Sequence, residues 1–414
     1  MARLKEYNGY YCESEYEYAF IGFLETEGWI YSSGNNISRV TKRDVLIADD
    51  FKKFIVDTNP DLTEDEVTQI FDNVRLVGSE SDFATLHKVY GWMVNGIQFT
   101  PQDGIARMIP LIDFKKDSNK NIFRVVNQFT VEYTNNGQKE NRRPDVLLFV
   151  NGMPLCVIEL KNPADANATI YDAWEQINIR YWRDIPHLLH YCTLACISDG
   201  VKTRLGTVHT PYEHFYAWRR VNDGDAVYTL PFEETETMIK GVYAPERFLE
   251  IFRDYIYFQD SIYDSDEVEI VCRYPQFFAA RLLRQSIINS VVQKSGKGGT
   301  YFGATGFGKT YTMAFLARQL ALRCTDIPEI GSPTIILIVD RDELQKQGAK
   351  LFTKSKEFLN LGEVAVVKNR AQLRQELGAR QSGGFYICTI QKFCDREDDK
   401  IGLINDRQNI ICFS

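Results

Sequence analysis

Residues 142–161 read RRPDVLLFVNGMPLCVIELK, and this stretch predicts a β-hairpin with charged side chains at its open end. Two apolar runs flank a central Asn-Gly pair, which tolerates the positive φ angles of a two-residue hairpin turn. The hairpin brings Asp145 back beside Glu159 and Lys161. Glu159 and Lys161 are two residues apart on one strand and share a face, and carboxylates beside an ammonium suit Mg²⁺ and a water molecule.

The register of this hairpin decides whether the two carboxylates meet. A plain two-residue turn pairs Asp145 with Ile158, which places Asp145 and Glu159 on opposite faces. One extra residue, as a bulge at Gly152 or a kink near Pro144, returns both carboxylates to one face, and we predict such an irregularity. An ordinary hairpin with charged ends is the alternative, because short patterns of this kind also arise by chance.

Composition indicates a globular protein of two or three domains. The chain has 414 residues, of which 44% are hydrophobic, enough for a large core. Its 48 basic and 56 acidic residues give a net charge of −8, so any DNA contact must use local patches such as Lys115-Lys116 or Arg219-Arg220. The longest aliphatic run, residues 335–339, is far shorter than the ~20 residues of a membrane span. Without an apolar signal core at the start, the expected location is cytoplasmic.

Cysteine and histidine usage argues against a zinc site. The nine cysteines have no paired C-x-x-C spacing, which predicts free thiols. The five histidines have no partner cysteines at zinc-finger spacing, so we interpret them as structural.

The first 230 residues predict helices around a mostly antiparallel sheet. Residues 14–17 match a capping box for a helix that stops at Gly28. Glu17 is then either a helix cap, the more common role, or a third carboxylate for the hairpin site. Further amphipathic helices are expected at 63–74 and 83–94, and strands at 108–114, 123–133, 146–150, 155–160 and 191–198.

A helix over about residues 169–182 comes after the hairpin and is expected to cover its site. Gln176 and Arg180 are four residues apart, so they are expected to share a helical face and to contact a phosphate or orient the site. A surface polar pair is the alternative. Acidic, irregular sequence between about 222 and 269 places a domain boundary there, with a linker at 231–264 and a second domain at 265–414.

A second site is predicted at residues 300–310, TYFGATGFGKT, which fit G-x-x-x-x-G-K-T. A short strand is expected before the glycines and a helix over 310–322 after them. The glycines let backbone N–H groups surround phosphate, Lys309 reaches the β- and γ-phosphates, and the Thr310 hydroxyl binds Mg²⁺. A chance glycine-rich loop is the less frequent alternative. Apolar runs at 334–339, 384–389 and 409–413 predict a doubly wound parallel sheet.

These motifs together resemble the R subunit of type I restriction enzymes, which carries an endonuclease and a DNA-translocating motor. Arg143-Pro-Asp145 with Glu159-x-Lys161 resembles the PD-(D/E)XK nuclease motif. Residues 125–129, 197–200 and 204–206 recur at family-like positions around it.

The second half of the chain resembles a superfamily-two helicase motor. Arg273-Tyr-Pro-Gln276 is similar to the Q-motif that reads adenine, and residues 303–310 to motif I. Residues 339–344 and 388–391 are similar to motifs Ia and Ib, which touch the DNA strand.

The resemblance implies a PD-(D/E)XK nuclease-like mixed sheet with flanking helices at 1–230, followed by a partial RecA-like parallel α/β domain at 265–414. It implies double-stranded DNA as the substrate, Mg²⁺ and ATP as cofactors, and modification (methyltransferase) and specificity subunits as partners. Asp145 and Glu159 would hold Mg²⁺, and Lys161 would orient or deprotonate the attacking water. The residues implied for ATP are Arg273, Gln276, Gly303, Thr305, Gly306, Phe307, Gly308, Lys309 and Thr310.

Two features depart from the family pattern. The family often has Gln-x-x-x-Tyr after the nuclease lysine, whereas here Arg180 stands at that spacing from Gln176 and Tyr181 lies one place later. Residues 409–414 resemble the strand that leads directly into the Asp-Glu-Ala-His box of such motors, and the sequence stops before that box. We therefore expect a fragment of a longer subunit, with weak nucleotide binding and no useful ATP turnover. The alternatives are a stand-alone nuclease-helicase of repair or defence, and a DNA-docking module that does not cleave.

Overall fold

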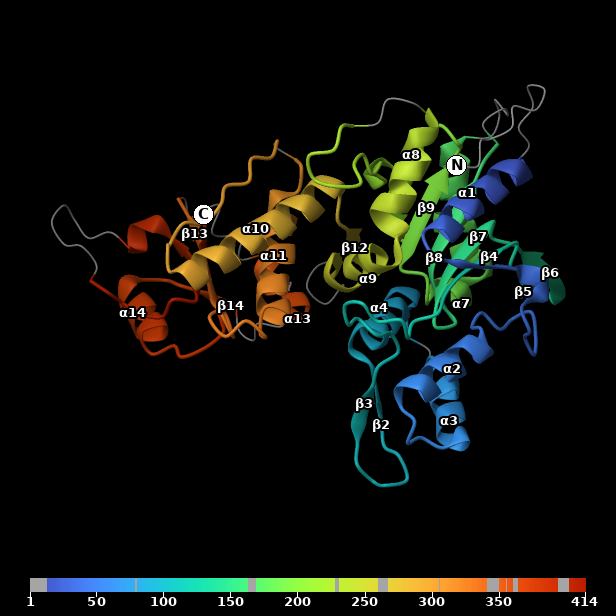
Figure 1. Ribbon diagram of the computed structural model, residues 1–414, viewed down its shortest axis with the longest axis horizontal. Coiled ribbons are helices and arrows are strands. Elements are labelled where there is room, and N and C mark those ends of the chain that lie inside the picture. The colour runs from blue at the N-terminus through green and yellow to red at the C-terminus, as the bar shows by residue number, and fades with distance from the viewer. Residues whose placement is uncertain are drawn as a thin grey trace. The chain divides into compact units, whose positions relative to one another are not determined.

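The computed structural model describes residues 13–78, 80–162, 169–227, 231–259, 267–304, 306–340, 350–354, 356–359, 364–393 and 402–414. The chain forms two compact units (Figure 1). Unit 1 consists of Met1–Arg253 with Val268–Val271, and unit 2 of Asp254–Glu267 with Cys272–Ser414. Much of the segment expected as a linker therefore belongs to unit 1.

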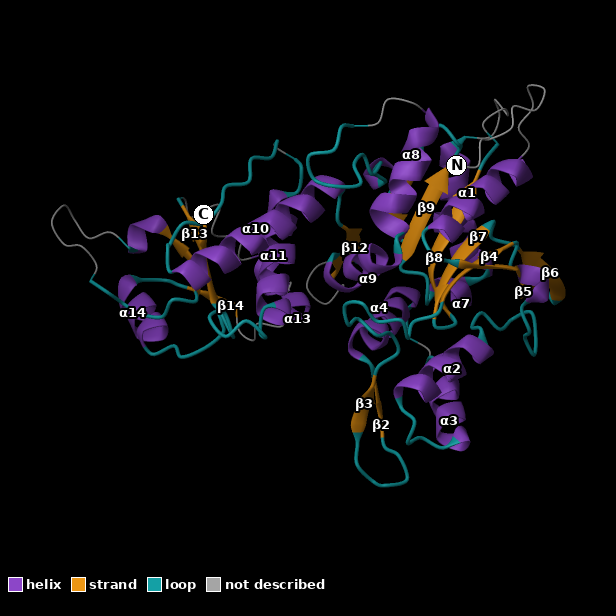
Figure 2. Cartoon of the chain, in the orientation of Figure 1, coloured by secondary structure: helices purple, strands orange, loops and turns teal. Residues whose placement is uncertain are grey.

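Unit 1 is built on a six-stranded mixed sheet (Figure 2). The strands, in spatial order, are β1 (Ile30–Ser33), β4 (Phe123–Asn127), β7 (Val146–Val150), β8 (Met153–Leu160), β9 (Leu194–Ser198) and β10 (Thr203–Thr207). β1 pairs with β4 and β8 with β9 in parallel, while the other neighbours are antiparallel. All residues of β7 and β8 are buried, so the central hairpin lies in the core of the unit.

Helices and two small ribbons surround this sheet. The helices are α1 (Glu13–Thr26), α2 (Ala48–Thr58), α3 (Glu64–Arg75), α4 (Asp82–Asn95), α5 (Ile170–Glu175), α6 (Trp182–Asp184), α7 (Pro186–Leu189), α8 (Pro231–Met238) and α9 (Pro245–Asp254). The ribbons pair β2 (Ile97–Phe99) with β3 (Arg107–Ile109) and β5 (Val131–Asn135) with β6 (Gln138–Arg142), and β12 (Val268–Val271) lies close to β10. Among the described residues, no helix is both long and apolar enough to span a lipid bilayer.

The turn of the β7–β8 hairpin is tight and deeply buried. Asn151 and Gly152 have φ angles of 51° and 76°, and Val150 pairs with Met153, as in a two-residue turn with positive φ at both positions. A Cβ on Gly152 would lie 2.2 Å from the carbonyl oxygen of Ile47. Only glycine fits this close approach between the turn and the chain that precedes α2.

Strand β8 contains one residue more than a regular pairing with β7 would use. The register between β7 and β8 shifts partway along the pair and leaves Leu155 without a partner. Beyond this bulge, the register brings Asp145 opposite Glu159, so the prediction of one extra residue is confirmed. Its predicted position, at Gly152 or near Pro144, is wrong, because Gly152 is needed for the tight turn and the bulge lies within β8.

Several predicted elements of unit 1 are divided differently in the structure. The strand expected over 123–133 is two strands, β4 and β5, because Gln128 adopts a φ of 52° between them. The helix expected over 169–182 is interrupted by a π-helix, η2 (Gln176–Tyr181). The strand expected over 108–114 is confined to the short β3. The predicted helices at 63–74 and 83–94 are confirmed as α3 and α4.

Unit 2 contains the predicted parallel sheet with one further strand. Its strands, in spatial order, are β14 (Val364–Val366), β15 (Phe385–Thr389), β13 (Thr334–Val339) and β16 (Ile410–Phe413), and all neighbours are parallel. The remaining elements are β11 (Ile256–Gln259), α10 (Tyr274–Gln293), α11 (Lys309–Arg323), α13 (Lys356–Leu359) and α14 (Arg370–Gly378). The prediction of a strand before the glycines is wrong, because residues 294–304 form no strand. Closely spaced glycines are disfavoured in paired strands.

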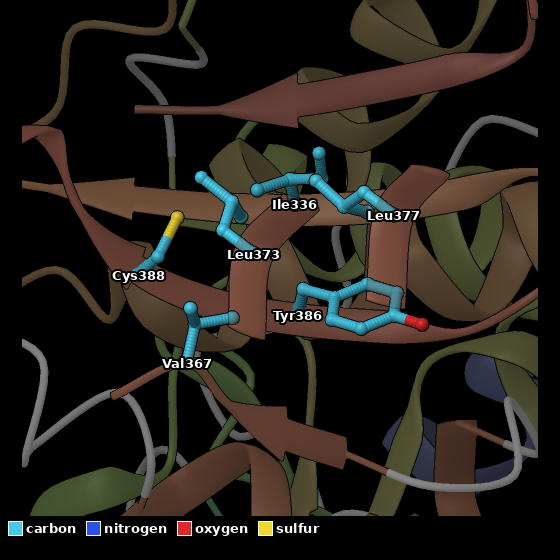
Figure 3. Packing of buried hydrophobic residues seen from close by; sticks show 6 residues of the cluster. All are labelled: Ile336, Val367, Leu373, Leu377, Tyr386 and Cys388. Carbon is cyan, nitrogen blue, oxygen red and sulfur yellow. The ribbon is translucent and has the colours of Figure 1, made fainter. Parts of the chain in front are cut away.

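Part of the unit 2 core lies between α14 and the sheet. Figure 3 shows the buried side chains of Leu373 and Leu377 from α14 facing Ile336, Tyr386 and Cys388 of the strands. This packing fixes the sheet whose carboxyl ends lie near the start of α11.

Candidate functional site: a buried carboxylate pair on the hairpin

The open end of the β7–β8 hairpin carries two carboxylates side by side. Asp145 precedes β7 and is 9% exposed, while Glu159 lies near the end of β8 and is fully buried. The backbone N–H of Leu160 donates to Asp145 Oδ2 over 2.9 Å, and the Asp145 N–H donates to Glu159 Oε1 over 3.4 Å. The bulge at Leu155 thus brings the two predicted metal ligands together.

Lys161 is linked to the same pair through two further side chains. Its Nζ lies 3.8 Å from Glu159 Oε2 and donates to Gln176 Oε1 over 3.0 Å. Gln176 Nε2 donates to Tyr181 Oη over 2.8 Å, and Tyr181 Oη donates to Glu159 Oε1 over 2.6 Å. Glu159, Lys161, Gln176 and Tyr181 therefore form a closed ring of polar contacts, which restricts the rotation of every member.

The backbone beneath Lys161 is also fixed. The Lys161 N–H donates to the carbonyl of Ser198, across the parallel pair β8–β9, over 2.8 Å. The Ser198 hydroxyl lies 2.7 Å from both Tyr16 Oη and Thr203 Oγ1 in a buried cluster of hydroxyl groups. Burial raises the pKa of Tyr16 to about 12, so its phenol remains available as a hydrogen-bond donor.

The π-helix decides which side chain meets Gln176. In a π-helix the backbone hydrogen bonds run from residue i to i+5, so a residue five places along lies over the first. Tyr181 is five places after Gln176 and bonds to it. Arg180, at the four-residue spacing, turns away and donates to Glu175 Oε2 over 2.6 Å. The expectation that Gln176 and Arg180 share a face is wrong, and Tyr181 takes the position next to the site.

Burial controls the electrostatics of this ring. Loss of hydration raises the pKa of Glu159 well above its usual range, the neighbouring Asp145 raises it further, and Lys161 and Tyr181 oppose the shift. Burial and then the neighbouring Glu159 raise the pKa of Tyr181 in the same way. The Tyr181 phenol therefore keeps its proton at neutral pH and donates a hydrogen bond to the carboxylate.

One oxygen of the site lacks a hydrogen bond within the described part of the chain. Glu159 Oε2 is completely buried and has no hydrogen-bond partner among the described residues, and the Lys161 ammonium at 3.8 Å is beyond hydrogen-bond distance. A buried carboxylate oxygen without a partner is energetically costly, which marks a position that a cation would stabilise. Within the described residues, no group of three or more His, Cys, Asp and Glu side chains is placed to hold a metal ion. Two carboxylates would fit Mg²⁺, which commonly keeps several waters.

Glu17 is buried but has a different set of partners. The described part of helix α1 starts at Glu13, so the predicted capping box at residues 14–17 is wrong, because Ser14 lies inside the helix and not at its N-cap. Glu17 is 4% exposed and accepts from Asn127 Nδ2 over 2.6 Å and from Gln128 Nε2 over 2.5 Å. Gln128 in turn donates its backbone N–H to the Asp145 carbonyl. Glu17 thus supports the chain segment beside the carboxylate pair.

The second candidate site, the glycine-rich segment of unit 2, is open to solvent. Gly306 and Gly308 have φ angles of 83° and 70°, and Gly308 is the N-cap of α11. Lys309 is exposed and its Nζ donates to the Gly303 carbonyl over 2.9 Å. Thr310 is also exposed and lines a cavity of about 620 Å³ together with residues at the carboxyl end of β13. Thr305 lies outside the described residues.

The predicted adenine-reading motif contacts this segment. Gln276 is 4% exposed, and its Oε1 accepts the backbone N–H of Arg273 over 2.8 Å. Its Nε2 donates to the carbonyl groups of Phe307 and Gly308 over 3.3 and 3.0 Å. The structure therefore brings Arg273, Gln276 and the glycines together, with the Gln276 amide bonded to the loop itself.

Comparisons with known proteins match both halves of the chain. A family model described as the type I restriction enzyme R protein N terminus matches residues 10–214, and a SWI2/SNF2 ATPase model matches residues 275–414. The chain is 29% identical to the putative type I restriction enzyme MjaIXP endonuclease subunit of Methanocaldococcus jannaschii over 95% of its length. It is likewise 29% identical to the type I restriction enzyme HindI endonuclease subunit of Haemophilus influenzae over 97%. The chain belongs to the type I restriction enzyme R protein family.

This member of the R protein family spans 39% and 38% of the length of those two relatives. The R protein model includes Asp145, Glu159, Lys161 and Tyr181, and the ATPase model includes the whole glycine-rich segment. Each candidate site therefore falls inside the residues matched by a different family model.

The remaining predicted contacts of this R protein are distributed over its surface. Lys115 and Lys116 are exposed, and Arg219 and Arg220 line a surface cavity. Residues 341–344 of the predicted motif Ia lie outside the described residues. In motif Ib, Gln391 Nε2 donates to the carbonyl of Asp340 at the end of β13.

The contact between Gln176 and Tyr181 is the part of the site that sequence reasoning missed. It depends on the π-helix, which is not visible in the helical periodicity of the sequence. The one available signal was the displacement of the tyrosine by a single place from the family spacing.

Proposed function

We propose that unit 1 is a PD-(D/E)XK endonuclease that hydrolyses phosphodiester bonds of double-stranded DNA at the Asp145, Glu159 and Lys161 site. The single observation that carries this proposal is the buried Glu159 Oε2, which lies next to a second carboxylate and an ammonium and finds no hydrogen-bond partner in the part of the chain that the structure describes. Such an arrangement is unfavourable for stability alone. It is explained by a function that requires negative charge at that position.

The roles of the side chains can be assigned from their contacts. Asp145 Oδ2 is held by Leu160 N–H and Glu159 Oε1 by Tyr181, so both carboxylates are fixed in orientation. A bound Mg²⁺ would supply Lewis-acid stabilisation of the charge that develops on the scissile phosphate. Lys161, fixed by Gln176, would donate a hydrogen bond that orients the attacking water.

We further propose that unit 2 is the first, RecA-like part of an ATP-dependent DNA translocase. Helix α11 and the glycines before it would bind the phosphates of ATP, Lys309 would turn from Gly303 to the β- and γ-phosphates, and Thr310 would bind Mg²⁺. The match to the ATPase model supports this assignment. The whole protein would act with modification and specificity subunits, as a type I restriction system requires.

Metal titration of the chain tests the nuclease site. We expect saturable Mn²⁺ binding by calorimetry, lost in Asp145→Ala and in Glu159→Ala and kept in Lys309→Ala, which changes only the second site. Absence of binding by the unmodified chain, with and without DNA, would contradict the metal site and favour a hairpin that docks on DNA without cleaving it.

Cleavage by the subunit assembled with its modification and specificity partners tests the chemistry. Asp145→Ala or Lys161→Ala is expected to reduce cleavage at least about 100-fold while translocation continues, since the first removes a metal ligand and the second removes the group that orients the attacking water. Lys309→Ala should abolish translocation and leave Mn²⁺ binding at the Asp145 and Glu159 site unchanged. Normal cleavage by Lys161→Ala would refute its assigned role.

A further inference from the structure

The two oxygens of the Glu159 carboxylate have very different surroundings. Oε1 accepts from Tyr181 Oη at 2.6 Å and from the Asp145 N–H at 3.4 Å, whereas no described residue offers a hydrogen bond to Oε2. A carboxylate with one oxygen held in this way cannot rotate freely. It presents the other oxygen in one direction.

A shift of one residue in the helix after the hairpin would change which side chain holds Oε1. In the observed π-helix, Tyr181 faces Gln176 and Glu159, and Arg180 pairs with Glu175. An α-helical course through the same residues would place Arg180 over Gln176 instead. An arginine there would add a second cation beside Lys161 and could bond both carboxylate oxygens, because its guanidinium is a bidentate donor. Oε2 would then be occupied.

The geometry points to Tyr181 as a positioning residue that reserves Glu159 Oε2 for the metal, with the π-turn as a one-residue insertion that selects Tyr181 over Arg180. This inference rests on the proposed nuclease function, because it specifies how Glu159 is presented. A phenol suits the task because it provides one donor and carries no charge at neutral pH.

The helix is anchored on both sides of the extra residue. Asn178 Nδ2, inside the π-turn, and Trp182 Nε1, directly after it, both donate to the carbonyl of Val208 over 2.9 Å, so the chain is held on both sides of Ile179. Ile179 lies between them and is 47% exposed. Since a π-turn accommodates one extra residue without rotating the later part of the helix, removing Ile179 should convert the turn to an α-helix and leave Tyr181 in position.

Mn²⁺ titration of the full chain and its variants tests this inference. Tyr181→Phe is expected to weaken Mn²⁺ binding about 10- to 100-fold, as is typical when a side chain that orients a metal ligand is removed. Deletion of Ile179 should keep affinity within about threefold, and Tyr181→Phe in that deletion background should again weaken it about 10- to 100-fold. The matched control Arg180→Ala should bind normally, because Arg180 faces Glu175.

The exchanged variant Arg180→Tyr/Tyr181→Arg tests the register without a deletion. It should bind Mn²⁺ as weakly as Tyr181→Phe, because the phenol then faces away from the site. Normal binding by Tyr181→Phe or by the exchanged variant would overturn the inference, as would loss of binding in a deletion variant whose far-ultraviolet circular dichroism and melting are unchanged. If the deletion variant does not fold, the exchanged variant decides. Absence of Mn²⁺ binding by the unmodified chain, with and without DNA, would overturn the proposed function as well, whereas equal binding by all variants would overturn this inference alone.

Discussion

The two candidate sites differ in what holds their functional groups. In unit 1, the side chains of Asp145 and Glu159 are buried and bonded to neighbours from a strand, a helix and the backbone. In unit 2, Lys309 and Thr310 are exposed, and Lys309 bonds to its own loop. The first site therefore depends on the packing of the whole unit, whereas the second depends on a short run of backbone. Damage to the framework should affect the first far more than the second.

A methyl group on one glycine of each region tests this difference most strongly. Gly152→Ala places a Cβ 2.2 Å from the Ile47 carbonyl oxygen, and Gly308→Ala places one 2.6 Å from the Gln276 side-chain amide, which can move away. We expect Gly152→Ala to lower the free energy of unfolding of unit 1 by about 3 kcal/mol or more, from backbone clash and positive φ together. Gly137→Ala is the matched control, since Gly137 has a φ of 81° and no described atom within 4 Å of its Cβ position, and should cost about 1 kcal/mol.

Tryptophan fluorescence during urea unfolding measures this effect selectively. The five tryptophans, Trp29, Trp92, Trp174, Trp182 and Trp218, all lie in unit 1. The fluorescence transition should move to lower urea in Gly152→Ala and stay in place in Gly308→Ala. Equal shifts in Gly152→Ala and Gly137→Ala would show that the close approach to Ile47 adds nothing.

Removing the charge of Glu159 should stabilise unit 1. The folded-state pKa of Glu159 is raised, so its ionisation costs the most stability above that folded pKa, and the cost shrinks as pH falls and is gone only below the unfolded pKa. Glu159→Gln should therefore be more stable than the unmodified chain by about 1–3 kcal/mol at neutral pH without metal, with a difference that shrinks in acid. Urea unfolding from pH 8 down to pH 5 measures it. A less stable Glu159→Gln at pH 8 would mean that its ion pair with Lys161 outweighs its burial.

The smallest effect is expected in the open site. Lys309→Ala should change the stability of the chain by less than about 0.5 kcal/mol, because an exposed side chain with one hydrogen bond to its own loop contributes little. Its nucleotide binding should be lost. Melting followed by circular dichroism, with calorimetry using ATP and Mg²⁺, measures both. A large loss of stability would place Lys309 in the framework and remove the contrast between the two sites.

This contrast also explains what the sequence could predict. The glycine-rich segment and its following helix are contiguous, so residues 303–310 could be identified without knowledge of the fold. The parallel strands β13, β15 and β16 were predictable from continuous apolar runs, because burial on both faces leaves no alternation to interpret. The predicted strand before the glycines failed, since Gly298 and Gly299 make that segment a poor strand.

The hairpin site was only partly predictable. Asp145, Glu159 and Lys161 could be named from the Asn-Gly turn and the need for one extra residue, but the bulge at Leu155 could not be located, because an apolar run does not reveal where pairing slips. The π-helix was missed for a related reason, since the spacing of Gln176 and Arg180 fits a regular α-helix. The partners of Glu17 were equally hidden, as Asn127 and Gln128 are far from it in sequence.

The bulge in β8 has a consequence for how related sites should be sought. The bulge adds one residue to β8, and the π-turn adds one residue to the helix that follows. Both irregularities determine which side chains contact Glu159. A search pattern with fixed spacing between its letters would reject this chain, as Gln-x-x-x-Tyr does. A template written as distances between carboxylate, ammonium, amide and phenol groups would accept it, and would also find chains in which a deletion has removed either irregularity.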